Sequence, residues 1–166
     1  MPDLMTHTCL GLILKKIKPD FFQRTDRLGG ILLIFLLGNI LPDVSGRVPI
    51  IIFPKGALFF SVYHTLAGAL IIAYLISVFF ERTIRKPVFF ILFAGMTFHM
   101  VTDLIQKDIF GDGYKIFYPI NISIDFGFLW PEDTLFFLPF LLIAVGVLYR
   151  EIVLEKVRNY FIRSDK

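Results

Sequence analysis

Apolar residues fall in long blocks that are separated by short charged clusters. The three clearest blocks span residues 57–80, 87–106 and 134–149. As helices rising about 1.5 Å per residue they extend about 36, 30 and 24 Å, and the hydrocarbon core of a bilayer is about 30 Å thick. Shorter apolar blocks lie at residues 28–41 and 5–17. The pattern predicts an all-α protein, an integral membrane bundle of four to five helices.

The two N-terminal blocks form a predicted helical hairpin, with the break between them at Pro19 and Asp20. The block at 5–17 is short, so crossing the bilayer, lying at its interface and sitting inside the bundle all remain open. The last block could begin as early as Phe126. Residues 1–150 are expected to hold the bundle, and residues 151–166, which mix charged and apolar positions, a cytoplasmic amphipathic tail.

Composition supports a membrane protein. Hydrophobic residues make up 56% of the 166 residues, and 20 residues are phenylalanine, whereas soluble domains are about 45–50% apolar. One core of this size cannot hide so much apolar surface, which excludes a soluble globular domain. The net charge of +3 is modest and its basic residues cluster at helix ends, so lipid is the expected partner and no nucleic acid is expected. The single cysteine, Cys9, excludes an intrachain disulfide.

The basic residues predict an orientation. Of the 17 Lys and Arg, 13 lie in the connection 15–27, the loop 81–86 and the tail from 150, and four lie in 42–56 and 107–133. Because the cytoplasmic loops of membrane proteins are enriched in Lys and Arg, we expect a multi-pass protein of the bacterial inner membrane with a cytoplasmic C-terminus. The first residues have no basic region or small-residue cleavage site, so no removable signal peptide is expected.

Five candidate metal ligands lie in or beside the apolar blocks. Asp43 directly follows the block 28–41, and Asp103 lies four residues after His99, so both of these side chains share one helix face. In the predicted topology all five side chains fall at one level near the outer interface. They are His7, Asp43, His64, His99 and Asp103.

These residue types point to a divalent cation. Imidazole and carboxylate bind zinc, and they also suit manganese or iron, so zinc is preferred and one or two ions are expected. Water bound to zinc has a pKa near 7 in favourable sites, which provides hydroxide for attack on an ester or phosphoester, with Asp43 or Asp103 as general base. Simpler roles stay open: Asp43 capping a turn, and His99 with Asp103 forming a structural hydrogen-bonded pair.

The outer segment 107–133 permits two interpretations. It could form a lid in which Lys115, or Arg47 from the neighbouring segment, binds a substrate phosphate. It could instead form an interfacial belt, because Trp130 and Tyr118 are residue types that lie at headgroup depth. The two interpretations are compatible.

Short motifs at these positions carry a family resemblance. Thr6-His7-Thr8, Leu41-Pro42-Asp43, His64-Thr65-Leu66 and the stretch from His99 to Asp103 occur in the order typical of the YdjM-like family of membrane-bound metal-dependent hydrolases, which the chain resembles. The ligand order is also similar to that of the zinc-dependent phospholipase C and single-strand nuclease superfamily. This resemblance implies one ion held by Asp43, His64, His99 and Asp103, and a second held by His7 with Asp103 bridging.

Together these features predict a membrane-embedded hydrolase acting on a lipid-linked ester or phosphoester near the outer face of the inner membrane. Two alternatives remain. Intramembrane His and Asp residues also serve transporters and ion or proton channels. A closed four-ligand site could hold a structural metal in a protein without catalytic activity.

Overall fold

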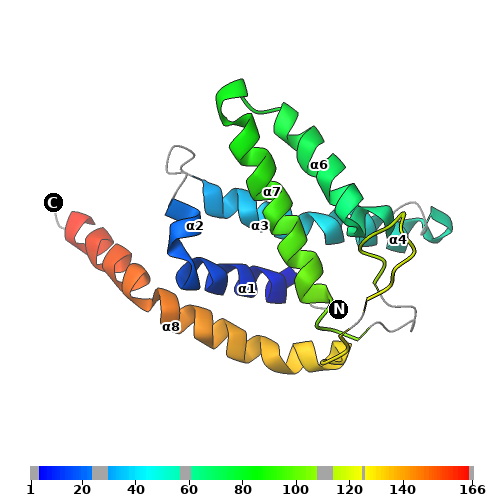
Figure 1. The fold of residues 1–166 in the computed structure, drawn as a ribbon. Coiled ribbons are helices and arrows are strands. Elements are labelled where there is room, and N and C mark those ends of the chain that lie inside the picture. Colours follow the sequence, from blue (N-terminus) through cyan, green and yellow to red (C-terminus); the bar gives the residue numbers. More distant parts are fainter. Residues whose placement is uncertain (1–3, 24–29, 57–60, 108–113, 125, 165–166) are drawn as a thin grey trace.

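The computed structural model of the protein describes residues 4–23, 30–56, 61–107, 114–124 and 126–164. In these residues the regular elements are helical, apart from two isolated β-bridges, which confirms the predicted all-α class. The α-helices are α1 Leu4–Ile17, α2 Pro19–Gln23, α3 Ile31–Pro42, α4 Val48–Ile52, α6 Leu66–Val78, α7 Arg82–Asp103 and α8 Pro131–Ser164. In the view of Figure 1, α6 and α7 form a hairpin that crosses the direction of α1, α3 and α8.

The N-terminal hairpin follows the prediction. Helix α1 ends at Ile17 with Lys15 and Lys16 in its last turn, and α2 begins at Pro19. Proline suits a first helical position because the amide hydrogen that it lacks has no partner there. Helix α1 lies between α3 and α8 (Figure 1), and the Tyr149 hydroxyl of α8 donates to the carbonyl of Leu12 at 3.1 Å. The N-terminal helix is therefore packed into the bundle.

Helix α3 does not end where the sequence predicted. Beyond Pro42 the chain continues through a π-helical turn, η2 Asp43–Arg47, directly into α4. Proline removes one backbone donor, and a widened turn accommodates this loss without ending the helix. The 22-residue path Ile31–Ile52 is one of two described helical segments long and apolar enough to cross a membrane. Asp43 thus lies inside a continuous helical path, and the prediction that it follows a helix end was wrong.

Helix α6 is shorter than the predicted block 57–80, of which residues 57–60 lie outside the described part of the structure. The helix begins only at Leu66, because Thr65 is extended and its hydroxyl accepts a hydrogen bond from the amide of Gly68 at 3.1 Å, a typical N-cap. A separate 3₁₀ turn, η4 Val62–His64, precedes it. His64 therefore lies before α6, and its predicted place inside the helical block 57–80 was wrong.

Helix α7 is the second candidate membrane span, with 22 residues. It begins five residues before Pro87, the predicted start, because the charged stretch from Arg82 continues the helix in the N-terminal direction. It packs closely on α3 through two glycines. A Cβ on Gly38 would lie 2.4 Å from the carbonyl oxygen of Leu92, and one on Gly95 would lie 2.2 Å from that of Phe35. Only glycine permits this backbone approach.

Helix α8 runs without a break from Pro131 to Ser164, so the tail expected from residue 151 continues the same helix. Its C-terminal turns extend beyond the rest of the bundle (Figure 1). The helix does not begin at Phe126. Instead, the amide of Phe126 donates to Leu104 at 3.1 Å, and that of Leu129 to Ile105 at 3.2 Å. These bonds hold the start of α8 beside the end of α7.

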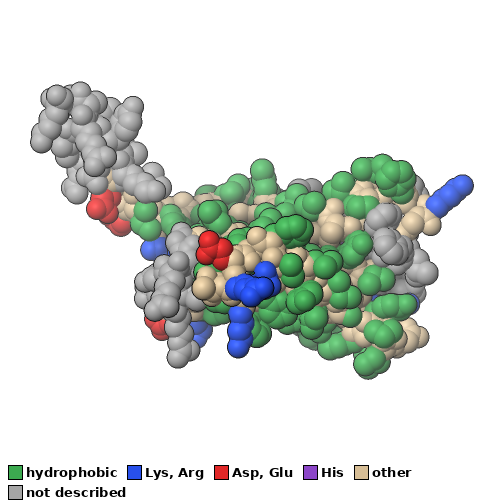
Figure 2. Space-filling view, turned by 90° about the horizontal axis from the view of Figure 1, so that it is seen from above, with side chains coloured by type: hydrophobic (Ala, Val, Ile, Leu, Met, Phe, Trp, Pro, Cys, Tyr) green, Lys and Arg blue, Asp and Glu red, His purple; other side chains and the backbone are tan. Residues whose placement is uncertain are grey.

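The surface is unusually apolar. Phe35, Leu92 and Met96 are fully buried, but many large hydrophobic side chains of α6 and α8, such as Ile71 and Val147, are exposed. Hydrophobic side chains cover much of the described face in Figure 2, where charged groups are few. A soluble monomer rarely exposes so much contiguous apolar area, whereas a surface that contacts lipid requires it.

Candidate metal centre

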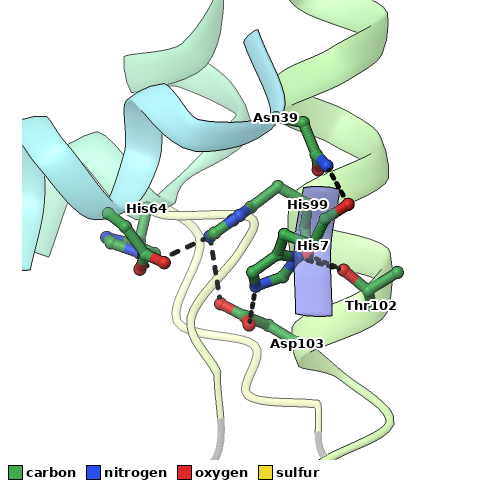
Figure 3. Close-up of polar contacts among 7 residues, drawn as sticks. His7, Asn39, His64, His99, Thr102 and Asp103 are labelled. Carbon is green, nitrogen blue, oxygen red and sulfur yellow. Dashed lines mark hydrogen bonds and ion pairs between the residues drawn. The ribbon is translucent and has the colours of Figure 1, made fainter. Parts of the chain in front are cut away.

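The five predicted ligands converge, although they come from four separate segments. His7 lies on α1, Asp43 on η2, His64 on η4, and His99 and Asp103 on α7. Figure 3 shows the three imidazoles and Asp103 pointing toward one another. His7 and His99 are fully buried, Asp43 and Asp103 are nearly so, and His64 is the most accessible, with 17% of its side chain exposed.

One group of ligands surrounds Asp103. Its Oδ1 lies 3.3 Å from Nε2 of His7, and its Oδ2 lies 3.4 Å from Nε2 of His99. The rings of His7 and His99 are stacked, with centroids 4.0 Å apart. One ligand atom from each of these three residues lies within 4.8 Å of the others, so the group could hold a metal ion.

A second group surrounds Asp43. Its Oδ1 lies 3.4 Å from Nε2 of His64 and 3.7 Å from Nε2 of His99. These three residues also place one ligand atom each within 4.8 Å of one another. Nε2 of His99 therefore faces both aspartates and joins the two groups into one centre.

The distances fit ligands of a shared ion. Zinc is bound by imidazole and carboxylate at about 2.0–2.2 Å, so two tetrahedral ligands lie about 3.3–3.6 Å apart. The four imidazole–carboxylate distances, from 3.3 to 3.7 Å, fall at or close to this range. A direct charge-assisted hydrogen bond between such groups is shorter, about 2.7–2.9 Å. The donor set and its spacing thus suit a divalent cation.

Thr102 determines which nitrogen of His7 faces the centre. Its hydroxyl donates to the carbonyl of His99 at 2.7 Å. Since that bond uses its one proton, its oxygen accepts from Nδ1 of His7, 2.9 Å away. Nε2 of His7 then carries a lone pair directed at the Asp103 carboxylate. Two acceptors facing each other in a buried site repel, and a cation between them makes the contact favourable.

Three buried ring nitrogens of this centre make no hydrogen bond in the described part of the chain. Nε2 of His7 and both ring nitrogens of His99 are inaccessible to water and make no hydrogen bond there. A buried polar group without a partner is costly, and metal coordination is one way of satisfying an imidazole nitrogen. These atoms support a ligand role for His7 and His99.

Two supporting residues were not predicted. Asn39 of α3 donates from Nδ2 to the carbonyl of His7 at 2.6 Å and so fixes α1 against α3 at the level of the centre, while Thr102 orients the His7 ring. Their positions in the sequence could have identified them. Asn39 lies one helical turn before Asp43, and Thr102 lies beside Asp103 in an apolar helix where polar residues are uncommon.

Of the two predicted substrate-binding residues, only the Lys115 side chain is described, and it is not part of this cluster. Lys115 is exposed, and no other described residue makes a hydrogen bond or ion pair with its side chain. The side chain of Arg47 lies outside the described part of the structure, as do residues 108–113 of the predicted lid. A phosphate-binding role for Arg47 and Lys115 remains a prediction.

Comparison with known proteins identifies the family. A family model described as YdjM inner membrane protein matches residues 1–162 of the 166. No curated protein and no solved structure matches the chain. The match covers nearly the whole sequence, including all five converging side chains, and it agrees with the two candidate membrane spans. The chain therefore belongs to the YdjM inner membrane protein family.

Proposed function

We propose that the protein is a metal-dependent hydrolase of the inner membrane that cleaves an ester or phosphoester linkage in a lipid-linked substrate. The observation that carries this proposal is the convergence of three histidines and two aspartates at imidazole–carboxylate distances of 3.3–3.7 Å in an apolar bundle. Buried ionisable groups are costly in a membrane and are retained where a cation or a reaction requires them.

The geometry supports one principal ion and a second, bridged ion. His99 has one Nε2 lone pair, so it serves a single ion, which we assign to His99, Asp43, His64 and Oδ2 of Asp103. Oδ1 of Asp103 faces His7 instead. A carboxylate that presents one oxygen to each of two imidazoles is suited to bridging two ions. We propose zinc for both, since nitrogen and oxygen ligands at tetrahedral spacing match its preference.

When bound at these residues, such an ion would supply a Lewis acid for the ester or phosphoester oxygen and for activating water. The protein contributes the orientation of the imidazoles, through Thr102 and Asn39, and a proton acceptor. Asp43 is the proposed general base, because both oxygens of Asp103 are assigned to ions. Asp43 lies beside His64, the most exposed of the five side chains. Substrate and water therefore reach the centre most easily along the edge formed by His64 and Asp43.

The compact arrangement favours a hydrolase over the alternative of a transporter or proton channel. A relay across the bilayer requires ionisable groups at successive depths. Here the two aspartates and three histidines form one cluster at the C-terminal end of α7. Arg47 and Lys115, on segments near the ends of the membrane helices, are the proposed contacts for a substrate phosphate.

Metal analysis tests the first part of the proposal. We expect the protein, purified in detergent, to contain one to two equivalents of zinc by elemental analysis, and the His99→Ala variant to lose most of it. The matched control is Glu81→Gln, which removes a carboxylate about 27 Å away along α7. Metal-free wild-type protein, or equal metal in wild type and His99→Ala, contradicts the proposal.

Hydrolysis assays test the second part and separate an enzyme from a protein with a structural metal. Fluorogenic lipid esters and phosphodiesters are supplied in mixed micelles with metal-loaded and chelated protein. We expect turnover with one linkage class only in the loaded form. It should be lost in Asp43→Asn and Asp103→Asn and retained in Glu81→Gln. Bound zinc with no turnover of either class supports the structural alternative.

A further inference from the structure

A cavity lies beside the metal centre and is not part of its ligand set. It has a volume of about 360 Å³ and lies between α1, α7 and α8. Leu10 of α1 and Phe137 and Leu141 of α8 form apolar walls, and Thr102 and Gln106 line it on the side of α7. This volume is within the range of about 300–1,000 Å³ typical of pockets for small ligands.

The cavity adjoins the metal centre through Thr102, whose hydroxyl accepts the hydrogen bond from Nδ1 of His7 at 2.9 Å. Gln106 lies just beyond, where its backbone N–H donates to the carbonyl of Asp103 at 3.0 Å. One end of a ligand in the cavity would therefore lie next to Thr102 and Gln106, which contact the proposed metal ligands His7 and Asp103. Its other end lies among leucine and phenylalanine side chains.

The side chain of Gln106 gives independent support for a ligand in this cavity. Its residue is only 1% exposed, and neither Oε1 nor Nε2 makes a hydrogen bond with any described residue. A buried amide without partners costs free energy, and the cavity that it lines is otherwise mostly apolar. Retaining a glutamine here is explained by a ligand whose polar group bonds to it, since a leucine would fill the same space without that cost.

The surroundings indicate what the ligand is. Phe140 and Ile105 line the same cavity and are also exposed on the surface of the bundle. In a membrane protein this surface meets lipid, so a hydrocarbon chain can enter sideways from the bilayer. We propose that the cavity holds the hydrocarbon chain of the lipid substrate, and that Gln106 Nε2 donates a hydrogen bond to an oxygen of the ester or phosphoester linkage at the head of that chain. Identifying the linkage as the one cleaved rests on the proposed hydrolase function; chain binding does not.

Photocrosslinking tests chain binding. The probe is a phosphatidylethanolamine with a diazirine at the end of one acyl chain, added to the purified full-length protein in detergent, and labelled peptides are mapped by mass spectrometry. We expect labelling to concentrate on peptides containing Leu10 and residues 137–141. Leu141→Trp fills the cavity and should reduce this labelling to the level of the lipid-exposed residues of α6. The control Leu142→Trp adds the same ring at an exposed neighbour that does not line the cavity, and it should leave labelling unchanged.

Gln106→Leu tests the polar contact. Loss of one hydrogen bond should weaken probe binding about fivefold, while thermal stability is retained or increased because a buried unpaired amide is removed. Labelling spread evenly around the bundle, or unaffected by Leu141→Trp, overturns the cavity assignment. Unchanged probe affinity in Gln106→Leu overturns the role of the amide.

Zinc content is measured in the same samples to separate this proposal from the proposed function. Localised labelling without bound zinc supports the cavity and contradicts the hydrolase. Bound zinc and turnover, together with labelling spread evenly around the bundle, support the hydrolase and contradict the cavity assignment.

Discussion

At the scale of single residues, the threonine that precedes Asp103 decides the chemistry available to His7. The Thr102 hydroxyl donates to the His99 carbonyl and accepts from Nδ1 of His7, so Nε2 is left as the donor atom for a cation. Without this acceptor the His7 ring can adopt the other tautomer and present a proton to Asp103. Side chains that orient metal ligands in this way typically contribute about 10–100-fold in metal affinity or activity.

Thr102→Val keeps the size and shape of the side chain but removes the hydroxyl. We expect zinc affinity, measured by competition with a chromogenic chelator, to fall about 10–100-fold. Thr102→Ser retains the hydroxyl and should stay close to wild type. Equal affinities in the valine and serine variants would show that the His7 tautomer is not set by this contact.

His64 and His99 should differ in importance. Nε2 of His99 faces both aspartates and is fully buried, whereas Nε2 of His64 faces Asp43 and the side chain is partly exposed. Water can replace an exposed ligand more easily than a buried one. We therefore expect His99→Ala to lose most of the bound zinc and His64→Ala to lose less of it, as measured by elemental analysis. A greater loss of zinc in His64→Ala than in His99→Ala would require a different principal site.

Most residues of the candidate site could be predicted from the sequence. Ionisable side chains are rare in apolar helices, so three histidines and two aspartates stood out, and the spacing of four placed His99 and Asp103 on one face. Asn39, Thr102 and Gln106 were missed because uncharged polar residues occur in membrane helices for many reasons. Their roles depend on which neighbouring helix they meet, and a single sequence does not contain that information.

At the scale of elements, two local structures position the ligands in ways that the hydropathy pattern did not predict. The pattern predicted a helix ending at residue 41, just before Asp43, and placed His64 inside the apolar block 57–80. In the structure a π-helical turn carries Asp43 and a 3₁₀ turn carries His64. Hydropathy reports that a segment is buried, but the width of a helical turn depends on backbone hydrogen bonds that apolar side chains do not reveal. Long helices were predicted well and their ends poorly for the same reason.

The role of the 3₁₀ turn can be tested by a substitution at a residue that is not a metal ligand. A Cβ on Gly68 would lie 2.2 Å from the carbonyl oxygen of Val62, in the turn that carries His64. Gly68→Ala should therefore displace this turn and weaken zinc binding as His64→Ala does, with the helices intact by circular dichroism. Wild-type zinc affinity in Gly68→Ala would mean that the turn adjusts without moving His64.

The crossing of α3 and α7 also depends on glycine. Because added Cβ atoms would lie 2.2–2.4 Å from backbone oxygens, Gly38→Ala and Gly95→Ala should each lower the free energy of unfolding by about 1–3 kcal/mol. Gly146→Ala on α8 is the control, since nothing lies within 4 Å of its added Cβ; it should be neutral or stabilising by about 1 kcal/mol. Thermal unfolding in detergent measures all three. Destabilisation by Gly146→Ala equal to that of the other two would show that helix packing is not the cause.

At the scale of the whole molecule, the metal centre defines one end of the protein. His99 and Asp103 lie in the last turns of α7, and Arg82, Arg85 and Lys86 lie in its first turns, at the opposite end of the helix. If this basic end faces the cytoplasm, as its charge predicts, the centre opens toward the periplasmic face. The proposed substrate would then be a lipid whose linkage lies in the outer leaflet.

Cysteine labelling in intact cells tests this orientation. In a Cys9→Ser background, Lys115→Cys reports on the segment after α7, and Glu81→Cys reports on the loop before it; both positions are exposed. We expect a membrane-impermeant maleimide to label Lys115→Cys in intact cells and Glu81→Cys only after the inner membrane is permeabilised. The opposite pattern would place the same centre at the cytoplasmic leaflet. The ligand geometry would be unaffected, because it depends on how the helices pack and not on which side of the membrane they face.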